Sequence, residues 1–174
     1  LNVITESDEP PLSYESGISV VIGDKAAVEQ AAEDDRIAAL NHGQSGACDL
    51  VWPTWKNAQR HGPFRAGWIA QHDQSIRDAA ARCYVGSAIN SDGHADKIEA
   101  LLSAMKWNHH LAEVLEQTRP LAEALEERGD AKWEEGDLDD AYESFRRSVE
   151  LDPRRSWARR KAEDVRDLRL KITR

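Results

Sequence analysis

Residues 128–153 read RGDAKWEEGDLDDAYESFRRSVELDP, and the helical pattern of the chain is most specific here. A helical composition that starts at about Leu121 ends at the turn Gly136-Asp137, and a second helical pattern then runs to Asp152-Pro153. The apolar residues of the second pattern recur at three- and four-residue steps and are Leu138, Ala141, Tyr142, Phe145 and Val149. A third amphipathic segment covers about residues 155–170. The spacing therefore predicts an antiparallel pair of helices followed by a covering helix.

The stretch from about Leu121 to Pro153 closely resembles a tetratricopeptide repeat, whose period is about 34 residues. The matching residues are the apolar Leu125, the small Gly129 and Ala141 where two helices approach closely, the turn residue Gly136, the aromatic Phe145 and the terminal Pro153. Arg128 and Lys132 depart from the pattern, because an apolar and an aromatic residue are usual there. Trp133 is the neighbour that can supply the missing packing, and residues 155–170 stand in the place of the capping helix.

The resemblance implies a protein-interaction or assembly function, with a helical groove that holds a peptide or a partner helix. Since stacked neighbours stabilise such repeats, we expect the helix predicted at 96–117, or another chain, to pack on this one. Some of these repeats grip a C-terminal carboxylate with basic residues. The corresponding surface here is acidic, so we expect a protein or peptide with a basic segment, bound by Glu126, Asp130 and Glu134.

Composition and charge limit the alternatives. The chain has 174 residues, is 40% hydrophobic and carries a net charge of −9, so we expect one soluble domain with at most a small appendage. No apolar run approaches the length of a membrane span, and the acidity argues against a general nucleic-acid role. Residues 121–152 hold 12 acids and 4 bases, whereas residues 154–174 hold 9 bases and 3 acids. The acidic hairpin could therefore meet the basic tail of a second copy in a homo-oligomer, although solvated charge is the ordinary meaning of such runs.

The first half of the chain has a more mixed pattern. A β-branched run at 18–22 predicts a strand, residues 25–40 predict a helix, and residues 48–52 could form a second strand. The segment 53–68 looks irregular. The predicted fold class is therefore mainly α, with a small α/β-like region over 1–90 and a helical region over 91–174.

Within the helical region, the turn Asn90-Ser-Asp-Gly93 precedes a predicted helix from Asp96 to about residue 117. Asp96 is the expected N-cap, and Thr118-Arg-Pro120 is expected to end that helix. His109 falls on its apolar stripe and is expected in the core.

A hydrolase, or part of one, is the competing functional interpretation. Asp92, His94 and Asp96 faintly resemble the His-x-His-x-Asp-His zinc signature of metallo-β-lactamase-like hydrolases, but Asp92 and Lys97 replace two of its histidines. A turn with a helix cap is the simpler explanation. Ser45 lies in a sequence that approximates a nucleophile elbow, but the expected order of strand and helix around it is reversed.

An aromatic and basic segment is the other candidate site. Trp55, Arg60 and Arg65 lie in the irregular stretch before Trp68, where rings and guanidinium groups could line a ligand pocket. Packing beneath a long loop is the favoured alternative.

The two cysteines, Cys48 and Cys83, match no paired metal-ligand spacing. Two buried free thiols are the favoured interpretation, and one disulfide is the alternative, so the compartment stays open. The chain starts at Leu1, which leaves open a processed product or a fragment.

Overall fold

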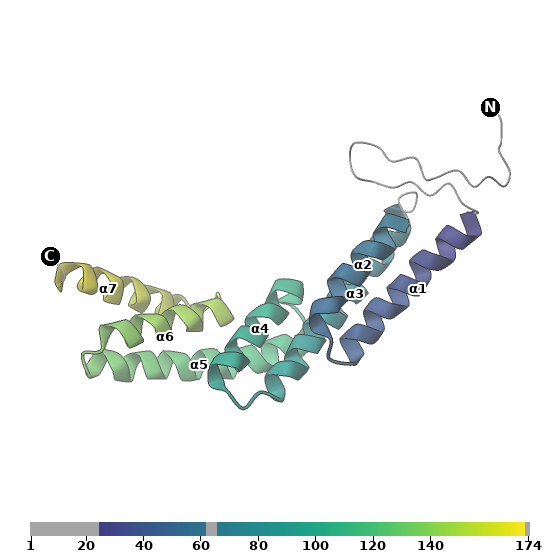
Figure 1. Ribbon diagram of the computed structural model, residues 1–174. Helices are drawn as coiled ribbons and strands as arrows, with labels where there is room; N and C mark the ends of the chain where they lie inside the picture. Colours follow the sequence, from purple (N-terminus) through teal and green to yellow (C-terminus); the bar gives the residue numbers. More distant parts are fainter. Residues whose placement is uncertain (1–24, 62–65, 173–174) are drawn as a thin grey trace.

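The computed structural model describes residues 25–61 and 66–172, and this part of the chain contains seven helices and no strand (Figure 1). The helices are α1 (Lys25–Gln44), α2 (Cys48–His61), α3 (Ala66–Ile89), α4 (His94–Asn108), α5 (Ala112–Glu134), α6 (Leu138–Leu151) and α7 (Ser156–Ile172). The prediction of a mainly α chain is confirmed. None of these helices is long and apolar enough to cross a membrane.

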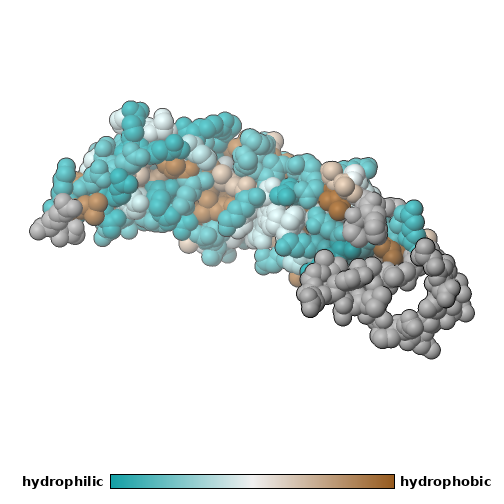
Figure 2. All heavy atoms as spheres, turned by 90° about the horizontal axis from the view of Figure 1, so that it is seen from above, coloured by the Kyte–Doolittle hydropathy of each residue, from teal (hydrophilic) through white to brown (hydrophobic). Residues whose placement is uncertain are grey.

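Consecutive helices pack as pairs, and the pairs form a row. α1 packs on α2, α3 on α4 and α5 on α6, while α7 packs on α6. Each pair also contacts the next one: α1 and α2 contact α3, and α3 and α4 contact α5. The row gives an elongated body, with α1–α3 at one end and α5–α7 at the other (Figure 1). The face shown in Figure 2 is mostly hydrophilic, with small separate apolar patches. The arrangement is repeat-like.

The first and third helix pairs share the same turn, 90 residues apart. Gly46 joins α1 to α2 with φ +84°, and Gly136 joins α5 to α6 with φ +80°. In both turns one amide donates to the carbonyl four residues back and a second donates to the carbonyl five residues back, over 2.9–3.0 Å. The donors are Ser45, Ala47, Glu135 and Asp137. The positive φ explains why glycine stands at both positions.

The buried residues of these two pairs also correspond at a shift of 90. Ala39 occupies the position of Gly129, Val51 that of Ala141, Trp55 that of Phe145 and Ala58 that of Ser148, and all eight are buried. In each pair a small residue on the first helix faces the hairpin, and an aromatic residue on the second helix fills its centre. The chain therefore contains a second hairpin of the same design, which was not predicted from the sequence.

The prediction of a small α/β-like region at the N-terminal end is not supported. Residues 48–52, predicted as a strand, begin α2, because Val51, Trp55 and Ala58 lie on one helix face and are all fully buried. Within the described residues, the segment expected to be irregular is helical: it belongs to α2 up to His61 and to α3 from Ala66. The strand predicted at 18–22 lies outside the described residues.

The helix predicted at 96–117 is two helices. The chain breaks at His109–Leu111, between α4 and α5, and α5 then runs through Pro120 without ending. His109 is exposed in this break, so its expected place in the core is wrong. α4 begins at His94 with Gly93 as its N-cap, so Asp96 belongs to the first turn and is not the cap. The break at 109–111 lets α5 fold back along α3 and α4.

Three apolar clusters follow the row. The first contains Ala39, Val51, Trp55 and Ala58 of the first hairpin with Ile76 and Ala80 of α3. The second joins Ala81, Val85 and Ala88 of α3 to α4, α5 and Leu151. The third contains Ala141, Phe145 and Val165, so it joins α6 to α7. One helix, α3, therefore belongs to two clusters, and the core continues along the molecule.

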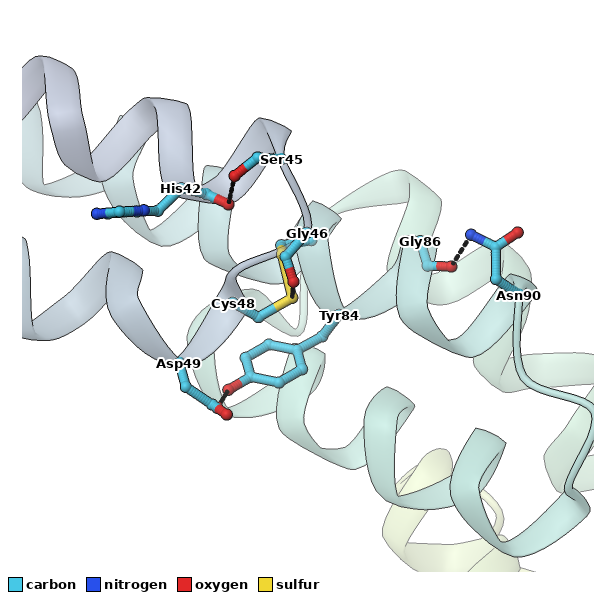
Figure 3. The surroundings of a disulfide bond; sticks show 9 residues. His42, Ser45, Gly46, Cys48, Asp49, Tyr84, Gly86 and Asn90 are labelled. Carbon is cyan, nitrogen blue, oxygen red and sulfur yellow. Dashed lines mark hydrogen bonds between the residues drawn. A yellow bond between two sulfur atoms is a disulfide. The ribbon is translucent and has the colours of Figure 1, made fainter.

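The two cysteines form a disulfide, with Sγ atoms 2.08 Å apart, and no free cysteine occurs in the described residues (Figure 3). The favoured prediction of two free thiols is wrong. The reason is tertiary: the start of α2 lies against the second half of α3, which brings two residues 35 positions apart within reach of one bond.

Candidate interaction surface

α5 carries a line of glutamates on its exposed side. Glu116, Glu123, Glu127 and Glu134 are separated by seven, four and seven residues, and all four are exposed. This spacing places them on one face of a helix, because seven and eleven residues are close to whole numbers of turns. We call these four residues the acidic stripe. The opposite face of α5 is buried in the core, through Val114, Thr118, Leu121, Ala122, Leu125 and Gly129.

A second row of acidic side chains on α5 faces the chain's own C-terminal helix. Arg155 donates to Glu126 over 2.8 Å, and the Lys161 ammonium donates to Asp130. Only 17% of the Glu126 side chain and 23% of the Arg155 side chain are exposed, so this pair is partly shielded from solvent. Of the three residues predicted to bind a partner, Glu126 and Asp130 are thus engaged within the chain. Glu134 belongs to the acidic stripe.

α7 is fixed to the α5–α6 hairpin by apolar packing as well as by charge. Ala158 and Val165 are fully buried. The Lys161 ammonium lies 5.5 Å from the centre of the Phe145 ring and 5.0 Å from that of Trp157. The basic tail therefore caps the acidic hairpin of its own chain.

The hairpin itself depends on a close approach between Gly129 and Phe145. A Cβ atom on Gly129 would lie 2.6–2.9 Å from three atoms of the Phe145 ring, which has no exposed surface. Trp133 packs edge-on to the same ring, with centroids 6.3 Å apart, and so supplies packing that Lys132 does not. Ser148 donates to the carbonyl of Ala122 over 2.6 Å across the hairpin. These contacts hold the helix that bears the acidic stripe.

A hollow of about 330 Å³ lies where α7 begins. It is lined by Glu126, Asp152, Arg154, Arg155, Ser156 and Trp157. Trp157 is 54% exposed, and the charges of both signs around it partly neutralise one another. The hollow therefore has no strong preference for an anion or a cation.

In the described part of the chain, the residues predicted to bind zinc are not grouped with other side chains that could ligate a metal ion. Asp92, His94 and Asp96 are exposed in the turn before α4 and in its first residues, where side chains two positions apart point in different directions. Within residues 25–61 and 66–172, no group of three or more His, Cys, Asp or Glu side chains is arranged to hold a metal ion.

The predicted ligand pocket is occupied by core packing at Trp55. Its side chain is fully buried, and its indole Nε1 donates to Asp73 over 3.0 Å. Arg60 is exposed near the end of α2, and Arg65 lies outside the described residues. Ser45 lies in the turn after α1, where its hydroxyl donates to the carbonyl of His42 over 3.2 Å. Since a helix precedes Ser45 and a helix follows it, the geometry of a nucleophile elbow is absent at this turn.

The disulfide lies beside a second hollow, of about 420 Å³, lined by residues 46–50 with Tyr84 and Ser87. The Tyr84 hydroxyl donates to Asp49 over 2.5 Å (Figure 3). Burial, together with this hydrogen bond, raises the pKa of Tyr84 to about 12. A phenol with this pKa stays protonated near neutral pH, so Tyr84 is a structural donor here.

Comparison of the chain with models of protein families, with curated proteins and with solved structures finds no match. Only Glu134 of the acidic stripe was predicted from the sequence. The signal of the stripe was the seven-four-seven spacing of the glutamates, which becomes informative once α5 is known to run unbroken from Ala112.

Proposed function

We propose that this chain is a protein-interaction module of the tetratricopeptide-repeat type, which binds a partner with a basic segment along the acidic stripe. The single observation that carries the proposal is the repeated hairpin: the same glycine turn and the same buried positions occur twice, 90 residues apart. Stacked hairpins with one terminal covering helix are the architecture that such modules use to present binding surfaces.

The second hairpin strengthens the resemblance stated for residues 121–153. A lone repeat would leave both faces uncovered, whereas here α3 and α4 pack between the first hairpin and α5–α6. α7 covers the other side of α6. The row therefore supplies the neighbours that a repeat of this family requires.

The chemistry of the partner follows from the charges that are left exposed. The glutamates of the acidic stripe point away from the buried face of α5. In this set Glu123 lies 3.8 Å from Arg155, at the edge of the contact with α7. Lysine and arginine side chains of a partner segment would be attracted to this line of charges, and a C-terminal carboxylate would be repelled.

Charge reversal of the stripe tests the proposal. The test variant is Glu123→Lys/Glu127→Lys/Glu134→Lys, and the matched control is Asp34→Lys/Glu163→Lys/Asp164→Lys, which makes the same change of net charge at exposed positions on α1 and α7. The probe is an amphipathic lysine-rich peptide, titrated by NMR at physiological salt. We expect at least a tenfold weaker Kd for the test variant and less than a threefold change for the control, because exposed charges beyond about 8 Å are screened.

The location of the binding site gives a second readout. Amide shifts in the wild-type chain should follow the exposed face of α5. Equal weakening by the two variants would show that the peptide senses net charge alone, and unchanged binding by the test variant would place the site elsewhere. Far-UV circular dichroism and thermal melting of both variants establish that each remains folded.

A further inference from the structure

The disulfide joins the first hairpin to α3, the helix that two apolar clusters share. Cys48 is the first residue of α2, in the first hairpin (Figure 3), and the element bounds put Cys83 in the second half of α3. Before Cys83, α3 contributes Ile76 and Ala80 to the cluster of the first hairpin. Around and after Cys83, it contributes Ala81, Val85 and Ala88 to the cluster of α4 and α5.

The non-covalent attachment of the first hairpin is comparatively local. The buried residues of its cluster come from α1, α2 and the middle of α3, and half-buried Trp52 of α2 also packs on Trp107 of α4, with ring centroids 5.0 Å apart. Two side-chain hydrogen bonds add to it, from Trp55 to Asp73 and from Tyr84 to Asp49. The clusters that hold α4 to α7 together contain no residue of α1 or α2. The first hairpin can therefore open while the remainder keeps its core.

We infer that the Cys48–Cys83 disulfide is a redox latch on the first hairpin: oxidised, it holds α1 and α2 against α3, and reduced, it lets them open as a unit while α4–α7 stay folded. This inference is independent of the proposed function, because the acidic stripe lies on α5.

The bond is accessible to a reductant from one side. Cys83 is 6% exposed, whereas Cys48 is half-buried and borders the hollow lined by residues 46–50, Tyr84 and Ser87. A thiolate of a small dithiol attacks Cys48 Sγ, the bond between the two sulfurs breaks, and Cys83 leaves as a thiolate that takes a proton. The second thiol of the reagent then attacks the mixed disulfide and releases Cys48. The reagent is oxidised to its own disulfide, and two electrons and two protons pass to the protein.

Hydrogen exchange measured by mass spectrometry, with and without dithiothreitol, tests the latch on the unmodified chain. Loss of a cross-link across 35 positions raises the open population by up to about 600-fold in the chain-entropy description. We expect amides of α1, α2 and the first half of α3 to exchange at least tenfold faster after reduction. Amides of α5–α7 should change by less than twofold.

A variant without the two cysteines distinguishes loss of the disulfide from other effects of dithiothreitol. Cys48→Ser/Cys83→Ser should show the fast pattern without reductant and should not respond to dithiothreitol. Re-oxidation of the wild-type chain should restore slow exchange. A uniform acceleration over all helices, or no acceleration in α1 and α2, would overturn the inference.

Discussion

Substitution of Gly129 by alanine isolates the contact on which the α5–α6 hairpin depends. In an ordinary helix interior this change is stabilising by about 1 kcal/mol, because glycine has the poorer helix propensity. Here the added Cβ would lie 2.6 Å from Phe145 Cε1, 2.7 Å from Cδ1 and 2.9 Å from Cζ. The ring has no exposed surface, so it cannot swing into solvent. Overpacking of this kind costs about 1–3 kcal/mol.

The two effects oppose each other, and overpacking is the larger. We expect Gly129→Ala to lower the free energy of unfolding by about 1 kcal/mol net, which corresponds to a melting temperature lower by about 2–4 °C for a chain of this size. Gly86→Ala is the matched control, because Gly86 lies inside α3 and a Cβ there would meet nothing within 4 Å. The control should be stabilising by up to about 1 kcal/mol.

Urea unfolding followed by circular dichroism gives both free energies. The second test is Gly129→Ala in a Phe145→Leu background, where the ring atoms that crowd the new Cβ are gone. The glycine substitution should cost less there than in the wild-type chain. A Gly129→Ala variant that matches Gly86→Ala in stability would refute the close approach of α5 and α6.

Two further predictions concern polar contacts. Arg155→Gln should lower the free energy of unfolding by about 1–2 kcal/mol, because it leaves the partly shielded Glu126 carboxylate without its guanidinium donor. Arg166→Gln, at an exposed pair with Asp167, should lower it by less than about 0.5 kcal/mol. Equal losses for the two variants in urea unfolding would contradict this. The phenol of Tyr84 has its pKa raised to about 12 in the folded chain, against about 10 in the unfolded chain. The unfolded state thus loses this proton first, so the stabilisation is complete below about pH 10 and is lost as the pH rises toward 12; Tyr84→Phe should reduce this loss, and an unchanged alkaline profile would show that the residue is not responsible.

The α5–α6 hairpin could be predicted from the sequence because the residues that define it lie close together in the chain. The small residues, the turn glycine and the aromatic residue lie within 17 residues, from Gly129 to Phe145. The first hairpin has the same design, but alanine replaces the first glycine and tryptophan replaces phenylalanine, so its pattern is less recognisable. Its β-branched and aromatic residues around Pro53 also favoured a strand followed by a loop, and tertiary burial of Val51 and Trp55 overrides that preference.

Only the sign of the charge at the candidate site could be predicted from the sequence. The acidic character of α5 is visible in the sequence, but which glutamates remain exposed depends on where α7 packs. The sequence around Glu126 and Asp130 does not indicate that Arg155 and Lys161 contact them, because these partners lie 29 and 31 positions further along the chain. The disulfide has the same origin, since 35 intervening residues conceal the proximity of its cysteines.

The shared membership of α3 in two apolar clusters also affects the stiffness of the molecule. A helix of 24 residues is about 36 Å long, and its backbone hydrogen bonds resist stretching and bending as one element. The first hairpin packs on one part of this rod, and α4 and α5 pack on another. A rotation of one cluster about the long axis of α3 must therefore turn the other cluster with it. No loop separates the two clusters along α3, so a bend at this point has to deform the helix itself.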